Sequence, residues 1–392
     1  MTPAARVQAA IDILDLVIAA ARNNGAPADR IVSDWFKSRR FAGSKDRRAV
    51  RELVYRAIRL CGDVPANGRA AMLRLALDDP ALPPLFDGSQ YGPALTQPGE
   101  PVATGGIAAD WLEARLAACE ISREEATALL DRAPLDVRIN ALKAGAASLP
   151  EGGEEIGIAG ALRYPFGTRI EDSPAFKAGA IEVQDAGSQL ACQAMALREG
   201  DRVIDLCAGA GGKSLALAVR VGHSGKVIAC DTDRSRLSRL GPRAARAGAE
   251  AIIETRLLDP GKELEALADW KDRADAVLVD APCSGTGTWR RNPESRWRLT
   301  EKWLGDVTSL QSRLLDLAAG LVKPGGALHY VTCSLLDEEG ADQVSAFLAR
   351  HSDWQAEPLA LGHGAPRGQG LRLSPFRDGT DGFFIARLVR IC

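Results

Sequence analysis

The chain has 392 residues, of which 46% are hydrophobic and 26% charged, and a formal net charge of -2. This composition excludes a disordered or fibrous protein and predicts a buried core divided among two or three domains. The small net charge excludes a protein that coats nucleic acid with its whole surface, so any contact with nucleic acid would need local basic patches. Charges or glycines interrupt the longest apolar stretches, which excludes a membrane-spanning helix. Eight cysteines without a secretory signal predict a reducing cytoplasm rather than a disulfide framework.

Residues 1–60 are predicted to be helical and basic. Apolar residues recur at heptad-like spacing near the start, at Val7, Ile11, Leu14 and Ile18. This part contains 12 Lys or Arg against 6 Asp or Glu, centred on residues 37–51. Such a run can neutralise RNA phosphates or form a solvated helix face, and the residues alone do not separate these interpretations. Residues 80–106 are rich in Pro and Gly, which predicts an irregular connection.

Residues 131–178 are predicted to form a small mixed module. It opens with PLDVRINALKA (134–144), in which Arg138 and Asn140 alternate with apolar residues along a strand. The alternation puts both polar side chains on one face. An ordinary amphipathic strand is the simplest interpretation of this pattern.

A glycine-rich turn between a strand and a helix is the first candidate binding site. Residues 202–219 read RVIDLCAGAGGKSLALAV, in which the apolar strand ends at Asp205. Glycines let the backbone approach a ligand closely, and the helix N-terminus offers free N–H groups. The next strand, KVIACD (226–231), ends in Asp231, at about the spacing where an acidic residue holds ribose hydroxyls in nucleotide-binding units.

Three kinds of nucleotide site compete for this turn. A Walker A loop needs a glycine five positions before Gly212, where this chain has Cys207. A dehydrogenase uses G-x-G-x-x-G, which the turn does not match. The carboxylate of Asp205 would repel a pyrophosphate but accept hydrogen bonds from an amino-acid ammonium group, which favours S-adenosylmethionine. A further strand-end acid, Asp259, makes a turn without a ligand the less favoured interpretation.

Two cysteines follow predicted strands further along the chain. Residues 275–280 (DAVLVD) and 327–332 (ALHYVT) are short and bounded by turn signals, and Cys283 and Cys333 come just after them. The carboxyl edge of a parallel sheet is where ligands bind, and a thiolate there can add to an electron-poor ring. The other cysteines are interpreted as small buried hydrophobes. The pair predicts covalent chemistry on a pyrimidine.

Aromatic and arginine residues alternate directly after Cys283, in TWRRNPESRW (288–297). Aromatic faces stack on splayed bases and guanidinium groups hold phosphates, so this stretch is a candidate RNA contact. A single Trp is more often part of a core. We therefore predict RNA contact for Arg290 and Arg291 and leave the two tryptophans open.

Together these motifs resemble the RsmB-type (Fmu/Sun) RNA cytosine-5 methyltransferases, which are related to the NOL/NOP/Sun proteins. The resemblance is close over residues 131–392 and looser over residues 1–60. Five motifs carry it in the same order: VQDAGSQLA (183–191), DLCAGAGGKS (205–214), DAPCSGTGTWRRNPE (280–294), LHYVTCSLLDEE (328–339) and DGFFIARL (381–388).

The resemblance implies a catalytic role for four residues. Cys333 would be the nucleophile that adds to C6 of cytosine, and Cys283 would assist the later elimination that frees the enzyme. Asp280 would hydrogen-bond the cytosine edge near N3 and stabilise the charge that develops there. Lys213 would lie against the same base and the cofactor.

It also implies how ligands are held. Asp205, Asp231 and Asp259 would hold the methionine amine, the ribose and the adenine of S-adenosylmethionine. The full set implied for this cofactor is Asp205, Cys207, Ala208, Gly209, Ala210, Gly211, Gly212, Lys213, Asp231, Arg236, Asp259, Asp280 and Pro282. The set assigned to RNA is Arg47, Arg48, Arg138, Asn140, Arg290 and Arg291. No metal is expected.

The chain departs from the family pattern at two places. The usual loop C-A-A-P-G-G-K-T has Gly209 and Ala210 in place of its second Ala and Pro, which loosens the turn. The usual Glu-Asn after the nucleophile is Glu339-Gly340, which leaves the role of Glu339 open. Neither change touches the cysteines, Asp280 or the turn lysine, so an active enzyme is expected.

The sequence thus predicts an α/β protein. We expect an all-α NusB-like RNA-binding domain (1–130), a small α+β module (131–178) and a Rossmann-like S-adenosylmethionine methyltransferase domain (179–392). The last would have a seven-stranded, mostly parallel sheet with one antiparallel strand. The expected function is C5 methylation of cytosine in 16S ribosomal RNA, by a cytoplasmic monomer without DNA or membrane contact.

Three alternatives remain. An RNA-binding ribosome assembly factor with a vestigial methyltransferase fold would need neither thiol. A methyltransferase for an exocyclic amine or a protein would need no cysteine after Pro282. A third alternative keeps the chemistry but has tRNA as the substrate. The paired cysteines favour the RNA cytosine-5 enzyme over the first two alternatives.

Overall fold

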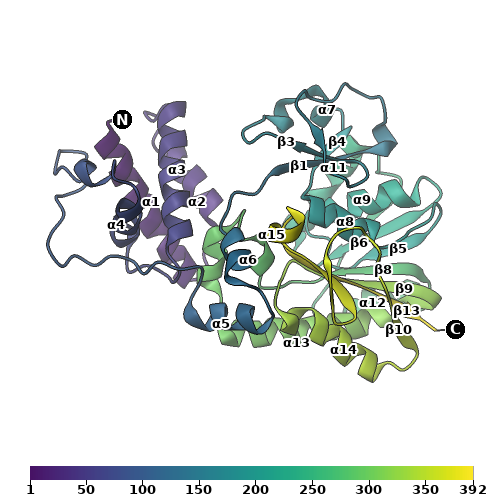
Figure 1. Cartoon of the computed structure of the whole chain (residues 1–392). Coiled ribbons are helices and arrows are strands. Elements are labelled where there is room, and N and C mark those ends of the chain that lie inside the picture. Colours follow the sequence, from purple (N-terminus) through teal and green to yellow (C-terminus); the bar gives the residue numbers. More distant parts are fainter. Residues whose placement is uncertain (392) are drawn as a thin grey trace. The chain divides into compact units, whose positions relative to one another are not determined.

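The computed structural model describes residues 1–391 and shows two compact units (Figure 1). The helical unit consists of Met1–Arg132 together with Thr288–Glu301. The sheet unit consists of Ala133–Gly287 and the chain from Lys302 onward. The predicted domains divide the chain differently, because the structure joins the small middle module to the following domain and assigns residues 288–301 to the first unit.

The helical unit is built from α1 (Pro3–Arg22), α2 (Ala28–Lys37), α3 (Ser44–Leu60), α4 (Gly68–Asp78), η1 (Pro83–Leu85), α5 (Asp110–Ala118), α6 (Arg123–Ala128) and η6 (Pro293–Arg298). Helix α1 begins after Thr2, whose hydroxyl accepts from the Ala5 N–H at 3.1 Å. A Cβ at Gly68 would lie 2.3 Å from the carbonyl oxygen of Ile11, so a glycine is required where α4 meets α1. Within residues 80–106, η1 is the one helix, which agrees with the predicted irregular connection.

Residues 288–301 interrupt the sheet unit in sequence but pack in the helical unit. The Arg296 guanidinium donates to the carbonyl oxygens of Ile58 at 2.7 Å and Cys61 at 2.8 Å. The indole N–H of Trp297 donates to the same Cys61 carbonyl at 3.2 Å. Because these groups cap carbonyls at the end of α3, the segment is a structural part of the helical unit.

The predicted small module is an antiparallel sheet with the order β2-β3-β1-β4. Its strands are β1 (Leu135–Ile139), β2 (Glu154–Glu155), β3 (Ala161–Tyr164) and β4 (Ile181–Val183), and η2 (Ala141–Lys143), η3 (Ile170–Asp172) and α7 (Pro174–Lys177) connect them. One face buries Val137 with Ile181 and Tyr164 in a core of its own. The sheet reaches past the predicted end of the module, because β4 pairs with β1.

The main sheet confirms the predicted α/β class. Its parallel part has the order β9-β8-β5-β6-β7, and β13 (Phe383–Arg390) runs antiparallel to β9. The parallel strands are β5 (Arg202–Asp205), β6 (Lys226–Asp231), β7 (Ile253–Leu257), β8 (Ala274–Asp280) and β9 (Val322–Thr332). The strand predicted at the C-terminal end is therefore present and antiparallel, as the resemblance implied.

The structure corrects the predicted number of strands from seven to nine within residues 1–391. Two short strands, β10 (Trp354–Glu357) and β12 (Gly370–Leu373), pair with different parts of the outer edge of β13. Strand β11 (Ala365–Arg367) adds a hairpin to β12. The predicted antiparallel strand β13 is thus followed on its outer side by short strands that the sequence analysis did not predict.

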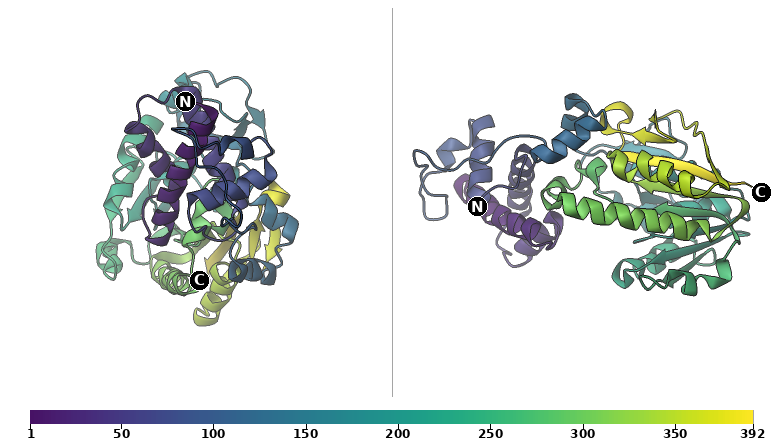
Figure 2. Two further views of the ribbon diagram at one scale, coloured as in Figure 1. Left: turned by 90° about the vertical axis from the view of Figure 1, so that its left-hand side faces the viewer. Right: turned by 90° about the horizontal axis from the view of Figure 1, so that it is seen from below.

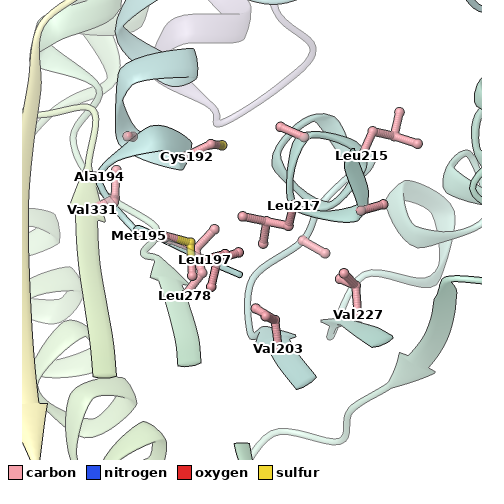
Figure 3. Packing of buried hydrophobic residues seen from close by; sticks show 14 of the residues in the cluster. Cys192, Ala194, Met195, Leu197, Val203, Leu215, Leu217, Val227, Leu278 and Val331 are labelled. Atoms are coloured by element: carbon pink, nitrogen blue, oxygen red, sulfur yellow. The ribbon is translucent and has the colours of Figure 1, made fainter. Parts of the chain in front are cut away.

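Helices cover both faces of this sheet. They are α8 (Ala186–Gln193), α9 (Gly212–Val221), α10 (Arg234–Leu237) and α11 (Leu240–Ala247) on one face, and α12 (Glu263–Ala266), η4 (Ala268–Trp270), α13 (Glu301–Ala319) and α14 (Ala341–Arg350) on the other, with η5 (Thr286–Thr288), η7 (Asp337–Glu339) and α15 (Pro375–Asp378) in connections. Alternate residues of β5 divide between the two cores, because Val203 packs toward α9 and Ile204 toward α13. Leu215 and Leu217 lie above Val203 and Val227 (Figure 3). The view from below shows α13 and α14 across the opposite face (Figure 2).

Replacing Arg296 by Ala should destabilise the helical unit. The side chain is 3% exposed, and its loss would remove one charged donor from each of the buried carbonyls of Ile58 and Cys61 and leave a cavity. We expect the free energy of unfolding to fall by about 3 kcal/mol in chemical denaturation. The exposed Arg40→Ala is the control and should change it by less than about 0.5 kcal/mol. Equal effects of the two variants would contradict the anchoring of residues 288–301.

Candidate active site

The two predicted cysteines meet at one edge of the main sheet. Cys333 directly follows β9 and Cys283 comes three residues after β8, and these strands are parallel neighbours. Their Sγ atoms lie 3.3 Å apart although fifty positions separate them in sequence. The hydrogen bond with Cys333, in which either sulfur can be the donor, and burial raise the pKa of Cys283 well above its ordinary value, so Cys283 stays protonated.

An ion pair lies on the same edge. Lys213, in the first turn of α9, donates from Nζ to Oδ2 of Asp280 at 2.7 Å. Burial alone would lower the pKa of Lys213, but the Asp280 carboxylate outweighs it and the pKa rises above the ordinary value. Lys213 therefore stays a cation at neutral pH, next to the end of the strand that leads to Cys283.

The glycine-rich turn is held by side chains from the next strand and helix. Gly211 has φ of 84°, and a Cβ there would lie 2.1 Å from Leu240, so only glycine fits. The Asp231 carboxylate accepts from the Gly209 N–H at 2.7 Å. The Arg243 guanidinium donates to the Ala210 carbonyl at 2.7 Å. These bonds fix the turn although it lacks the proline of the usual family pattern.

Asp205 ends β5 beneath the turn and is fully buried. Its Oδ2 accepts from the Ser214 hydroxyl at 2.6 Å, whereas its Oδ1 has no hydrogen-bond partner among the described residues. Burial raises the pKa of Asp205 to about 7, and the Ser214 hydrogen bond opposes this rise. A buried carboxylate oxygen without a donor is a place for a cationic group of a ligand.

A cavity of about 440 Å³ opens beside these groups. Its lining consists of Leu206, Cys207, Asp231, Thr232, Asp233, Arg236, Leu258, Pro260, Glu263, Asp280, Ala281, Pro282, Cys283, Leu310, Arg313, Leu314 and Cys333. Apolar side chains can contact a flat ring, and the carboxylates can accept from hydroxyls or attract a positive charge. The cavity brings both cysteines and Asp280 to one wall.

Comparison with known proteins agrees with this geometry. A family model described as 16S rRNA methyltransferase RsmB/F matches residues 192–389. The ribosomal RNA small subunit methyltransferase B of Klebsiella pneumoniae is 36% identical over 230 residues, 59% of this chain and 51% of that protein. The crystal structure of PH0851 matches with a TM-score of 0.75 and 26% identity over 99% of both chains. A methyltransferase homolog from Pyrococcus horikoshii matches with a TM-score of 0.58 and 26% identity, over 72% of this chain and 100% of that one.

The chain belongs to the RsmB/F family of 16S rRNA methyltransferases.

The resemblance inferred from the motifs is thereby confirmed, as is the methyltransferase fold of the main sheet. The chain spans about half the length of the curated relatives it matches. S-adenosylmethionine is the cofactor of this domain, and the described residues fit it. The free oxygen of Asp205 suits the methionine ammonium, and the acidic cavity wall suits a sulfonium.

The predicted cofactor residues of this RsmB/F protein divide into two groups. Those that line the cavity are Cys207, Asp231, Arg236, Asp280 and Pro282. The others lie around or beneath it, namely Asp205, Ala208, Gly209, Ala210, Gly211, Gly212, Lys213 and Asp259. Asp259 is exposed and directly precedes the cavity residue Pro260, so its contact with adenine stays a prediction.

Sequence reasoning missed part of the cavity. Leu310, Arg313 and Leu314 reach it from α13, and Glu263 reaches it from α12 while it pairs with Arg313 at 2.9 Å. The spacing of residues 310, 313 and 314 on one helix face was a usable signal. Which side of the sheet that face covers is a property of the fold and not of the spacing.

Three residues assigned to RNA are buried in the structure, which corrects their interpretation. Asn140 donates to the Gly179 carbonyl at 2.7 Å and the Ala247 carbonyl at 2.9 Å. Arg138 donates to Gln184 at 2.7 Å and is 8% exposed. Polar and apolar residues do alternate along β1. The polar side chains, however, are buried in contacts with α11 and with residues next to β4, and they do not face solvent.

Arg290 is the third of these residues and is 6% exposed within the helical unit. Trp289 and Trp297, left open from sequence, are buried as well, at 0% and 6% exposure. Arg291 is half-buried, whereas Arg47 and Arg48 are exposed on α3. The buried aromatic and arginine residues after Cys283 thus have a structural role, because their segment packs inside the helical unit.

Two further features were examined across residues 1–391. No helix there is long and apolar enough to cross a membrane. That part of the chain also has no cluster of three or more His, Cys, Asp or Glu side chains arranged to hold a metal ion. These two findings do not concern the cavity described above.

The affinity for S-adenosylmethionine should rise with pH around neutrality. Because the pKa of Asp205 is about 7, its carboxyl is mostly neutral at pH 6 and mostly charged at pH 8. We expect Kd, measured by isothermal titration calorimetry, to fall about tenfold over this range. Asp205→Asn should bind weakly at both values without this pH dependence. A Kd for the unmodified protein that is constant from pH 6 to 8 would exclude the ammonium contact.

Proposed function

We propose that this chain methylates C5 of a cytosine in small-subunit (16S) ribosomal RNA through a covalent bond between Cys333 and C6. One observation carries the proposal: two thiols lie 3.3 Å apart on the wall of a cavity that also contains Asp280. A transferase acting on an amine or on a protein has no use for such a pair. The family membership supports RNA as the substrate class.

Cys333 begins the reaction as the nucleophile. Its sulfur adds to C6 of the cytosine, and the C5=C6 electron pair moves toward C5 and the N3 side of the ring. This makes C5 nucleophilic without a strong base. S-adenosylmethionine, when bound, supplies an electrophilic methyl group on a sulfonium for C5 to take.

Asp280 orients the base and Lys213 stabilises the charge that the addition creates. The Asp280 carboxylate accepts a hydrogen bond from the exocyclic amino group at the cytosine edge near N3, and the Lys213 ammonium, 2.7 Å from that carboxylate, offsets negative charge on the ring. Both groups are fixed by their ion pair before the substrate arrives. The Lys213 ammonium therefore favours the charged adduct over the neutral base, as acceleration requires.

Cys283 assists the release of the product. Once C5 carries the methyl group, its proton passes to water, the C5–H electrons re-form the C5=C6 bond, and the C6–S bond breaks with its electrons on the Cys333 sulfur. A neighbouring thiol that donates a hydrogen bond stabilises this leaving thiolate. The raised pKa of Cys283 keeps it in the donating form.

Arg47 and Arg48 are proposed to contact RNA phosphates from the helical unit. Arg48 lines a surface hollow together with Lys45, Ala49, Glu52 and Arg132. Glu52 pairs with Arg132, which leaves a net positive charge around the hollow. Phosphates suit such a patch, and binding through it should weaken as salt rises.

The function is tested by incubation with labelled S-adenosylmethionine and small-subunit RNA. We expect label in 5-methylcytidine after nucleoside mass spectrometry. Transfer to tRNA alone would identify tRNA, and not ribosomal RNA, as the substrate. Label on an exocyclic nitrogen or on protein would overturn the proposed chemistry. Absence of transfer to naked RNA and to partly assembled subunits alike would favour a non-catalytic assembly factor.

Substitution of each cysteine should give a different defect. Cys333→Ala should abolish both methyl transfer and the covalent RNA adduct, because no nucleophile remains. Cys283→Ala should instead accumulate the adduct, seen as a denaturation-resistant RNA–protein band, because release is impaired. Cys119→Ala, which removes a buried thiol of the helical unit, is the control and should keep transfer. If the two outcomes are exchanged, the role assignment is wrong.

A further inference from the structure

We propose that Glu339 is a positioning residue for the two thiols: its buried carboxylate ties the loop after Cys283 to the loop after Cys333 and so sets their separation. The inference rests on the proposed function and extends it to a residue outside the cavity. Glu339 ends η7 and is 0% exposed. A carboxylate removed from water this completely is stable only where hydrogen-bond donors replace the solvent.

The donors come from both cysteine loops. Oε1 accepts from the Ser284 N–H at 2.7 Å, and Oε2 accepts from the hydroxyls of Ser284 and Ser334, the latter at 2.5 Å. Ser284 directly follows Cys283, and Ser334 directly follows Cys333. One carboxylate thus holds the residue next to each thiol, and the serine hydroxyls also lie 3.1 Å from each other.

Glu339 is itself fixed from two sides. Its carbonyl oxygen accepts from the Tyr330 hydroxyl at 2.8 Å and the Thr332 hydroxyl at 3.3 Å, both on β9. From α13, the Gln311 amide donates to Oε1 at 3.1 Å and to the Pro282 carbonyl at 2.8 Å. The carboxylate is therefore held in place by the sheet and a helix, so it can determine where the loops lie.

The residue after Glu339 is compatible with this role. A Cβ at Gly340 would lie 2.8 Å from the Phe384 ring, so a side chain there would displace that ring. The glycine that replaces the usual asparagine thus lets Phe384 pack closely without moving Glu339. The departure from the family pattern lies beside the network and leaves its hydrogen bonds intact.

The charge of Glu339 also acts on the thiol of Cys283. After the hydrogen bond with Cys333, burial and the charge on Cys333, Glu339 is a further cause of the raised pKa of Cys283. A network of this kind is sensitive to the loss of one member, because low polarity strengthens every bond in it. Geometry and electrostatics thus act on the same pair of sulfurs.

The first test needs no RNA. Glu339→Gln keeps the shape but removes the charge and places an amide donor against other donors. Alkylation of Cys283, followed by mass spectrometry as a function of pH, should shift to lower pH. Diamide, which oxidises two thiols to a disulfide and is reduced to a hydrazine, should join Cys283 and Cys333 more slowly. The control is the exposed Asp342→Asn on α14, which should match the unmodified protein.

The second test uses the reaction. Because Glu339 does not line the cavity, Glu339→Gln should lower kcat on the order of 10²-fold with the KM for S-adenosylmethionine unchanged. The covalent adduct should increase relative to turnover, since release depends on the placement of Cys283. Glu339→Asp should recover part of kcat by restoring the charge.

The outcomes separate this inference from the proposed function. If the unmodified protein transfers no methyl group, the function fails, while the thiol measurements still decide the role of Glu339. A folded Glu339→Gln protein with unchanged alkylation and disulfide rates would overturn the inference. If that variant does not fold, Ser334→Ala removes one bond of the network and should show the same shifts in smaller amount. Unchanged thiols in a folded Ser334→Ala protein would overturn it as well.

Discussion

The parallel pairing of β8 and β9 is the constraint on which the site depends. Adjacent parallel strands end at the same edge, so the residues after Asp280 and Thr332 must come close whatever lies between them in sequence. The strands also divide their side chains between two helix-covered cores, which fixes their register. A slip by one residue would turn the sulfur of Cys333 away from the cavity. The relative position of the two cysteines is therefore held by the strand pairing at the centre of the sheet.

Several charged groups lie at this edge, and most of them have compensating partners. Lys213 is paired with Asp280, and Glu339 is surrounded by neutral donors. The exception is Asp205, whose Oδ1 has no partner among the described residues. A protein stabilises an uncompensated buried carboxylate poorly, which is why the pKa of Asp205 rises until a cationic ligand supplies the missing interaction. The electrostatics thus agree with the predicted contact between Asp205 and the ammonium group of the cofactor.

The helical unit is joined to the sheet unit by a second segment of the chain, which directly follows the Cys283 loop. Residues 288–301 follow the Cys283 loop directly and are anchored in the helical unit by Arg296 and by Arg298, which donates to the carbonyls of Gly25 and Ala26 at 2.8 Å. The helical unit is therefore incomplete without a segment of the catalytic domain's sequence.

The sequence by itself determined the class of fold and the methyltransferase family, and it predicted the candidate reacting groups. The order of strands ending in Asp205, Asp231, Asp280 and Thr332 predicted the parallel sheet, and the two cysteines after strands predicted the reacting pair. These features are local, because a strand end, a glycine turn and a thiol are each visible in a few consecutive residues.

Only the tertiary structure decided which residues are exposed, which partners they have and how edge strands pair. It buried Arg138, Asn140 and Arg290, whose alternation with apolar residues was as compatible with a packed face as with a solvent face. It also gave Glu339 its place between two loops that lie fifty positions apart. Burial and long-range contact depend on what the rest of the chain places opposite a residue, and no local pattern contains that information.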